Sequence, residues 1–252
     1  MTPGSTTSAA NRRHETPGVY NLRDTGGYRA GTRTSRWGKL LRSDALHRLD
    51  ASGRDLLGEL GVAHIVDLRG ADELRTAPSS LDGLAVQVHH LPVFDDAAPA
   101  SRAGLQVGLA PIYDHMVDER GANLADAIRV IALAGDDEAV LVHCTAGKDR
   151  TGLVVAFALS AAGVDRDEVV ADYAQTAANL QGEWADAMLA GFRDSGAELT
   201  PEVVELVTAS PAPVLAALLE RVDREHGSVR AYLAAHGMTE DELDRLTAAL
   251  VR

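Results

Sequence analysis

The chain has 252 residues, a net charge of −13, 46% hydrophobic residues and a single cysteine. This length allows one large domain or two small ones, and the apolar content is enough for a substantial core. The acidic balance argues against nucleic acid as a partner, and a lone cysteine excludes an intrachain disulfide.

The N-terminal segment has the composition of a disordered leader. Residues 1–16 contain no apolar stretch of the kind found in a secretory signal, and no run approaches the roughly 18 apolar residues that a membrane helix needs. We expect a disordered leader over 1–16, a single domain over 17–252, a cytoplasmic location and no stable membrane insertion. The sequence leaves open export by a route that needs no signal peptide.

Charge is unevenly distributed along the chain. The first 50 residues hold 9 Lys/Arg and 4 Asp/Glu, a net +5, which leaves −18 for the remainder. This basic segment could attract an anionic substrate or a lipid surface, or it could be a solvated face that covers an acidic body.

Strand and helix patterns alternate through the first two thirds of the chain. Short apolar runs predict strands, and apolar residues at helical spacing predict helices. Strands are expected at 39–46, 62–68, 86–93 and 139–143, and helices at 50–60, 112–120, 123–133 and 152–162, with a loop or short helix at 70–81. This alternation is typical of an α/β fold with a mostly parallel central sheet flanked by helices.

The last third of the chain carries helical patterns alone. Helices are expected at 166–180, 183–194, 201–208, 213–226, 228–236 and 239–251. We therefore predict a helical C-terminal extension over 165–252 within the single domain.

Residues 139–152, AVLVHCTAGKDRTG, lead from a strand through a glycine-containing loop into a helix, and they carry the chemistry of the chain. Backbone N–H groups of such a loop can point inward and bind an anion, and the helix adds the positive end of its dipole. Arg150 supplies a planar fork for two phosphate oxygens, and the field of the loop favours the reactive thiolate of Cys144. The pattern indicates attack of a thiolate on phosphorus and a phosphocysteine intermediate that water cleaves.

A cysteine that ends an apolar strand is, taken alone, more often a small buried side chain than a nucleophile. Here a histidine precedes Cys144, a glycine lies within the loop, and a threonine follows Arg150. This context favours the functional interpretation.

The motif HCTAGKDRTG resembles the active-site loop of the protein tyrosine phosphatase superfamily. The Lys and Asp within it resemble an atypical bacterial subgroup typified by a mycobacterial tyrosine phosphatase. Three further stretches resemble that subgroup: NLRDTGG at 21–27, VDLR at 66–69, and DRD with ADY within 165–173. The resemblance covers most of the chain, and it implies that 21–27 pack near the site and that helices within 172–194 form a lid over it.

The resemblance also implies the catalytic roles. Cys144 is the expected nucleophile and Arg150 the phosphate-binding cation. A leaving alcohol needs a proton, and Asp149 resembles the acid proposed for the subgroup. Asp95 is the alternative general acid, because it follows a strand in the place where other members of the superfamily keep theirs.

Further residues are expected to bind substrate, namely Thr145, Ala146, Gly147, Lys148, Thr151, Asp67 and Arg69. Lys148 would contact a second anionic group of the substrate or pair with Asp67. Thr151 could donate its hydroxyl to the sulfur, and His143 is expected to orient the loop by hydrogen bonding.

These observations predict a metal-independent protein-tyrosine phosphatase without a cofactor, monomeric, that acts on phosphotyrosine. The resemblance extends the expected substrates to phosphoserine, phosphothreonine and phosphoinositides. A dedicated phosphoinositide phosphatase is one alternative, favoured by Lys148, one of only two lysines against 22 arginines. A non-catalytic module that binds phosphorylated ligands is the other, and the intact Cys144, Asp149 and Arg150 count against it. No His, Cys or Asp cluster has metal-ligand spacing.

Overall fold

The computed structural model describes residues 12–93, 108–196 and 198–252. A five-stranded sheet lies at its centre, in the order β1-β4-β7-β5-β6. The strands are β1 (Arg23–Asp24), β4 (Leu40–Ser43), β5 (Val62–Asp67), β6 (Gln87–His90) and β7 (Ala139–His143). All neighbouring pairs are parallel except β1 and β4, which confirms the predicted mostly parallel α/β sheet.

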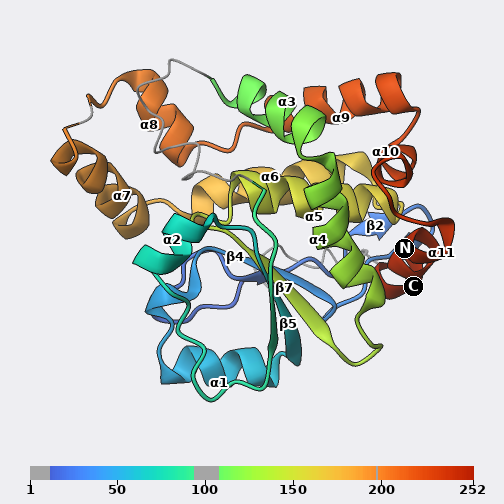
Figure 1. The fold of residues 1–252 in the computed structure, drawn as a ribbon, viewed down its shortest axis with the longest axis horizontal. Coiled ribbons are helices and arrows are strands. Elements are labelled where there is room, and N and C mark those ends of the chain that lie inside the picture. The colour runs from blue at the N-terminus through green and yellow to red at the C-terminus, as the bar shows by residue number, and fades with distance from the viewer. Residues whose placement is uncertain (1–11, 94–107, 197) are drawn as a thin grey trace, which may run out of the picture.

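Helices flank the sheet (Figure 1). They are α1 (Ala51–Glu59), α2 (Ala71–Thr76), α3 (Leu109–Glu119), α4 (Gly121–Leu133), α5 (Asp149–Ala161), α6 (Arg166–Asn179), α7 (Glu183–Asp194), α8 (Pro201–Thr208), α9 (Ala212–His226), α10 (Val229–Ala235) and α11 (Glu240–Leu250). Each predicted strand and helix in these ranges is present. The main shifts are at α3 and α5, each of which begins three residues before the expected position.

The central strand β7 divides the core into two layers. Its five residues are all buried, as is typical of a parallel strand that is covered on both faces. Val140 and Val142 point into the larger apolar cluster, which contains α4 and α5. Leu141, on the opposite face, joins a smaller cluster with Leu57 of α1. Figure 1 shows α1 on one side of the sheet and α4, α5 and α6 on the other.

Helix α5 is the central helix of the larger layer. All but two of its residues are buried, and it contacts α4, α6, α10 and α11. A helix that is apolar around its whole circumference must be covered on every side. Three helices of the C-terminal extension, α6, α10 and α11, provide much of that cover, so these helices are part of the core.

Two segments differ from the prediction. Residues 12–16 fall in the expected disordered leader, yet they contact β1 through the backbone. The His14 N–H donates to the carbonyl of Leu22, and Arg13 forms an isolated antiparallel β-bridge with Arg23 of β1. The remainder of that leader, residues 1–11, lies outside the described residues. A small hairpin of β2 (Arg29–Ala30) and β3 (Arg33–Thr34) was not expected, because strands of two residues leave no periodic pattern.

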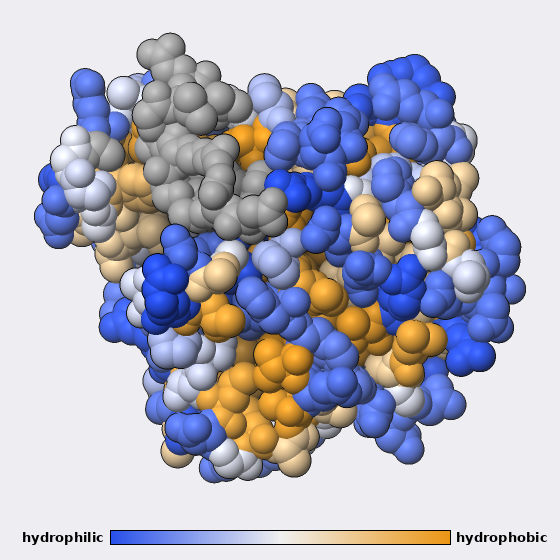
Figure 2. Space-filling view, viewed as in Figure 1, coloured by the Kyte–Doolittle hydropathy of each residue, from blue (hydrophilic) through white to orange (hydrophobic). Residues whose placement is uncertain are grey.

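The surface is mixed in character. In Figure 2 apolar residues gather in the lower half of the molecule, over the region of α1 and β5, and polar residues cover much of the remainder. Within the described residues no single helix is long and apolar enough to cross a membrane. The pair α8 and α9 passes on combined length and composition, but the two helices meet at 71°.

Candidate active site

The candidate site lies at the carboxyl end of the parallel strands. Ser43, Asp67 and His143 end β4, β5 and β7 side by side in register. Ligands bind at this edge in open α/β sheets. The catalytic loop, residues 144–151, leaves β7 here and enters the first turn of α5.

The backbone of the catalytic loop has a run of unused donors. The N–H groups of residues 145–151 make no hydrogen bond to any acceptor in the described part of the chain, and the first helical bond of α5 runs from the Gly152 N–H to the Lys148 carbonyl. N–H groups at a helix start are ready to bind an anion, and the helix dipole adds to their attraction. The loop therefore offers a site for phosphate.

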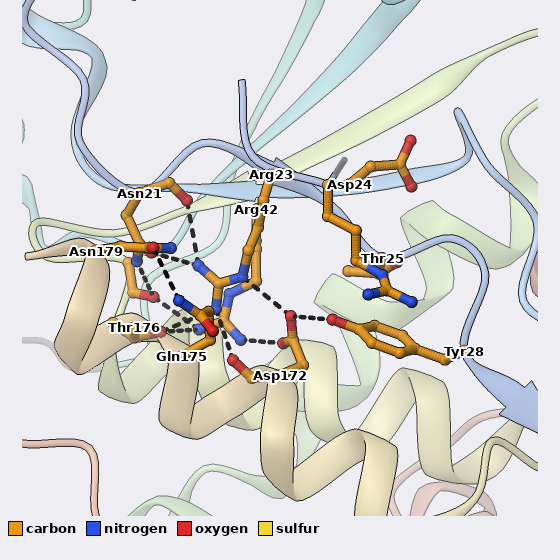
Figure 3. A network of polar contacts seen from close by, with 12 residues as sticks. Asn21, Arg23, Asp24, Thr25, Tyr28, Arg42, Asp172, Gln175, Thr176 and Asn179 are labelled. Carbon is orange, nitrogen blue, oxygen red and sulfur yellow. Dashed lines mark hydrogen bonds and ion pairs between the residues drawn. The ribbon is translucent and has the colours of Figure 1, made fainter. Parts of the chain in front are cut away.

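Side chains from behind the loop fix its carbonyl groups, and Figure 3 shows the two that do so, Asn21 and Arg42, within their polar network. The Asn21 amide donates to the carbonyls of Ala146, at 3.2 Å, and Gly147, at 3.1 Å. Arg42 also donates to the Gly147 carbonyl, at 2.8 Å. In a trans peptide plane the carbonyl and the next N–H point in opposite directions. Fixing these carbonyls on the outside therefore turns the N–H groups of Gly147 and Lys148 toward the inside of the loop.

Gly147 is the one residue of the loop with a positive φ, +63°. A Cβ at this position would lie 2.2 Å from the backbone oxygen of Ser43. The loop therefore needs glycine here for both its backbone conformation and its close contact with β4.

Asp172 of α6 is the centre of the polar network behind the loop. Its carboxylate pairs with Arg23 at 3.0 Å and with Arg42 at 2.5 Å, and it accepts a hydrogen bond from the Tyr28 hydroxyl. Burial alone would raise the pKa of this carboxyl, but the two guanidinium groups lower it to about 2. Burial also lowers the pKa of Arg23, to about 10. Asn179 and Thr176 of the same helix complete the network through Asn21 and Arg23.

Cys144 begins the loop and Arg150 lies near its end, and each is 2% exposed. Glu73 of α2 holds the Arg150 guanidinium through both terminal nitrogens, at 2.6 and 2.9 Å, and also accepts a hydrogen bond from the Thr145 hydroxyl. Burial works to lower the pKa of Arg150, but the charges of Cys144 and Glu73 outweigh it and the pKa is raised. Burial works to raise the pKa of Glu73, but Arg150 lowers it on balance. The guanidinium of Arg150, the expected phosphate-binding cation, is thus permanently charged and held in place.

His143, Asp67 and Arg69 form a buried group beneath the loop. The neutral His143 ring bonds the Cys144 carbonyl through Nδ1, at 3.2 Å, as expected of a residue that orients the loop. Burial lowers the pKa of this histidine. Asp67 and Arg69 pair at 2.6 Å, and both are 1% exposed. Neither offers a free charge at the site, so their direct contact with substrate stays a prediction.

Lys148 pairs with Asp149 and not with Asp67. Its ammonium donates to Asp149 Oδ1 at 2.8 Å and to the Ala209 carbonyl at 2.9 Å, and the side chain is 2% exposed. The predicted pairing of Lys148 with Asp67 is therefore wrong, because Arg69 occupies the Asp67 carboxylate. A contact of Lys148 with a second anionic group of a substrate stays a prediction.

Two other expected interactions have a different outcome. The Thr151 hydroxyl is buried and has no hydrogen-bond partner among the described residues, so its donation to the sulfur is not formed in this structure. Asp95, the alternative general acid, lies outside the described residues. Asp149, by contrast, is placed in the first turn of α5 beside Arg150, and its side chain is 14% exposed.

A cavity of about 540 Å³ opens beside the catalytic loop. Thr145, Tyr20 and Arg48 line one side, and α7 lines the other with apolar side chains that include Trp184. No residue of α7 is buried. Helices within 172–194 thus support the loop (α6) and form a wall of the cavity (α7), while closure over the site stays a prediction.

Three supporting residues were not identified from the sequence. Glu73 lies in the helix that follows β5, where an acidic residue in a first turn is common and gives no signal of its own. Arg42 lies in a strand among many arginines. Tyr113 of α3, whose hydroxyl donates to Asp149 Oδ1 at 2.7 Å, lies far from any motif. All three act across distances in sequence that only the fold brings together.

Comparison with known proteins extends the likeness beyond the loop. The tyrosine phosphatase family model matches residues 14–252. The chain is 34% identical over 281 aligned residues to the triple specificity protein phosphatase PtpB of Mycobacterium tuberculosis, a match that covers 94% of this chain and 98% of that protein. It is 29% identical over 222 residues to a tyrosine-protein phosphatase of Nostoc commune, which covers 83% of this chain and 73% of that protein.

Proposed function

The chain belongs to the tyrosine phosphatase family, and on that premise we propose that it hydrolyses phosphotyrosine by covalent catalysis through Cys144. The observation that carries the proposal is the run of N–H groups at 145–151 without an acceptor in the described chain, next to the paired guanidinium of Arg150. Together they form a preorganised site for the equatorial oxygens of a phosphoryl group.

The proposed reaction has two steps. The Cys144 thiolate attacks phosphorus, the phosphorus–oxygen bond of the ester breaks, and Asp149 gives its proton to the leaving oxygen. Water then attacks the phosphocysteine, Asp149 takes a proton from it, the sulfur–phosphorus bond breaks, and inorganic phosphate leaves. Arg150 and the loop N–H groups stabilise the charge that develops on the phosphoryl oxygens in both steps.

A wider substrate range, including phosphoserine, phosphothreonine and phosphoinositides, is part of the proposal. Its support is the cavity beside Thr145, where the exposed cationic side chain of Arg48 and the neighbouring His47 lie on the wall. A second anionic group of an inositol phosphate could bind there. The name of the mycobacterial relative, a triple specificity phosphatase, points in the same direction.

Turnover of a phosphotyrosine peptide and of phosphatidylinositol phosphates tests the proposal, with chelator present, for wild type, Cys144→Ser and Arg48→Ala. We expect activity that survives the chelator and is lost in Cys144→Ser. A fall in lipid turnover relative to peptide turnover in Arg48→Ala is expected if Arg48 binds a second phosphate. A wild type that binds these ligands without turnover would support the non-catalytic module instead.

A further inference from the structure

Two buried tyrosine hydroxyls lead to the carboxylate of Asp149. Tyr113 of α3 donates to Asp149 Oδ1 at 2.7 Å, and the Tyr113 and Tyr173 hydroxyl oxygens are 2.6 Å apart. Both side chains have 0% exposure, and their rings meet edge to face. Because the Tyr113 proton is directed at Asp149, Tyr173 must donate to Tyr113. The chain of donors therefore ends on the carboxylate.

The fold makes specific room for this pair. A Cβ on Gly152, in the first turns of α5, would lie 3.0 Å from the Tyr173 ring, so glycine allows the ring to approach the helix. Burying two hydroxyl groups is costly unless each finds a partner. Burial and the charge of Asp149 raise the pKa of Tyr113 and of Tyr173, so both stay neutral donors.

Lys148 supplies the second donor to the same oxygen. Its ammonium lies 2.8 Å from Asp149 Oδ1 and is itself fixed by the Ala209 carbonyl, between α8 and α9. Oδ1 thus accepts two hydrogen bonds, one from Tyr113 of α3 and one from Lys148, the residue before α5. Oδ2 has no hydrogen-bond partner among the described residues, which leaves it as the oxygen that can hold and transfer a proton.

We propose that Tyr113, supported by Tyr173, is a positioning residue that aims Asp149 Oδ2 at the oxygen of the leaving group. The inference rests on the proposed function, because it assigns Asp149 as the general acid. The proposal also predicts which substrates depend on proton transfer from Asp149. An acidic phenol leaves readily without a proton, whereas phenol itself and the alcohols of serine or inositol need protonation as the bond to phosphorus breaks.

The test is the dependence of kcat/KM on the leaving group, measured with p-nitrophenyl phosphate and phenyl phosphate for wild type, Tyr113→Phe, Tyr173→Phe and Asp149→Asn. We expect Tyr113→Phe to lower turnover of phenyl phosphate about 10-fold to 100-fold, and to lower turnover of p-nitrophenyl phosphate much less. Tyr173→Phe, which removes only the outer hydroxyl, should have the same pattern with a smaller effect.

The double variant separates positioning from packing. In the Asp149→Asn background, Tyr113→Phe should cause no further loss on phenyl phosphate, because the acid that it positions is absent. The proposal would be overturned if Tyr113→Phe lowered kcat/KM equally for both substrates. It would also be overturned if Tyr113→Phe lowered kcat/KM for phenyl phosphate as much in the Asp149→Asn background as in the wild type. It would also be overturned if Asp149→Asn showed no dependence on the leaving group. In that case the loss of p-nitrophenyl phosphate turnover in Cys144→Ser decides separately whether the proposed cysteine mechanism stands.

Discussion

Asp172 and Tyr173 are adjacent on α6, and they support opposite parts of the catalytic loop. Asp172 acts through Arg42 on the carbonyl of Gly147, and Tyr173 acts through Tyr113 on the carboxylate of Asp149. Neighbouring residues on a helix point about 100° apart, so one turn of α6 reaches both sides. The phosphate site and the proposed acid therefore share one support.

Removing the charge of Asp172 should destabilise the fold. Asp172→Asn leaves the guanidinium groups of Arg23 and Arg42 buried without their carboxylate, and such a loss typically costs about 3–5 kcal/mol. Urea unfolding measures the change. Glu168→Gln, one turn earlier on α6, is the matched control. Its partner Arg29 is largely exposed, so its loss should cost less than about 1 kcal/mol. Equal costs for the two variants would contradict the assigned role of Asp172.

The amide of Asn21 should matter for phosphate binding. Asn21→Asp replaces a donor to two loop carbonyls by a carboxylate that repels them, so the loop N–H groups lose their fixed direction. We expect affinity for vanadate and kcat/KM to fall by about 10-fold to 100-fold, the equivalent of one or two buried hydrogen bonds. Asn123→Asp makes the same change at a residue that donates to the Pro92 carbonyl, away from the loop, and its vanadate affinity should stay close to wild type.

Gly147 and Gly163 form a matched pair for the backbone of the loop. Both have positive φ, +63° and +90°, but only Gly147 has a backbone atom in the place of a Cβ. Gly163→Ala should cost about 1 kcal/mol of stability and leave turnover intact. Gly147→Ala should lower kcat/KM by at least about 100-fold, because it displaces the N–H groups that are proposed to bind the transition state. Similar turnover in the two variants would show that loop geometry is not critical.

Asp44 should make stability depend on pH. Burial raises the pKa of this carboxyl to about 6, although the N–H groups of Tyr20 and Asn21 donate to it. The folded protein therefore binds the proton more tightly than the unfolded chain, in which the pKa of an Asp is about 4. The contribution of Asp44 to the free energy of unfolding, about 3 kcal/mol, is present below about pH 4 and is lost as the pH rises through about 6.

Asp44→Asn checks this pH dependence. The Asn amide oxygen can accept the same two hydrogen bonds without a charge, so the variant and wild type should be similarly stable at about pH 4 and the variant more stable at about pH 7. Chemical unfolding across this range measures the difference. A difference that is independent of pH would show that the carboxyl titrates as in the unfolded chain.

Most of the fold could be predicted from local patterns. Strand 139–143 and the helices at 183–194 and 201–208 have the expected bounds, because apolar periodicity and start signals such as Thr200-Pro201 act within a few residues. The chemistry of the loop could likewise be predicted from one motif, HCTAGKDRTG. The residues that support the loop could not be predicted, since no local pattern around Glu73, Arg42 or Tyr113 indicates a contact. They are defined only by which strand ends and helices the fold brings together.

The distance in sequence between the loop and its supports also has a kinetic consequence. The hydrogen bond from Arg23 to Asp172 joins residues 149 positions apart, and Asn21 reaches the loop across 125. Contacts of this kind close the longest chain loops and slow folding, so they form late. A nascent chain that has just completed the HCTAGKDRTG segment would hold its nucleophile and arginine without the geometry to use them. Activity should thus be the last property regained during refolding, after the secondary structure has returned.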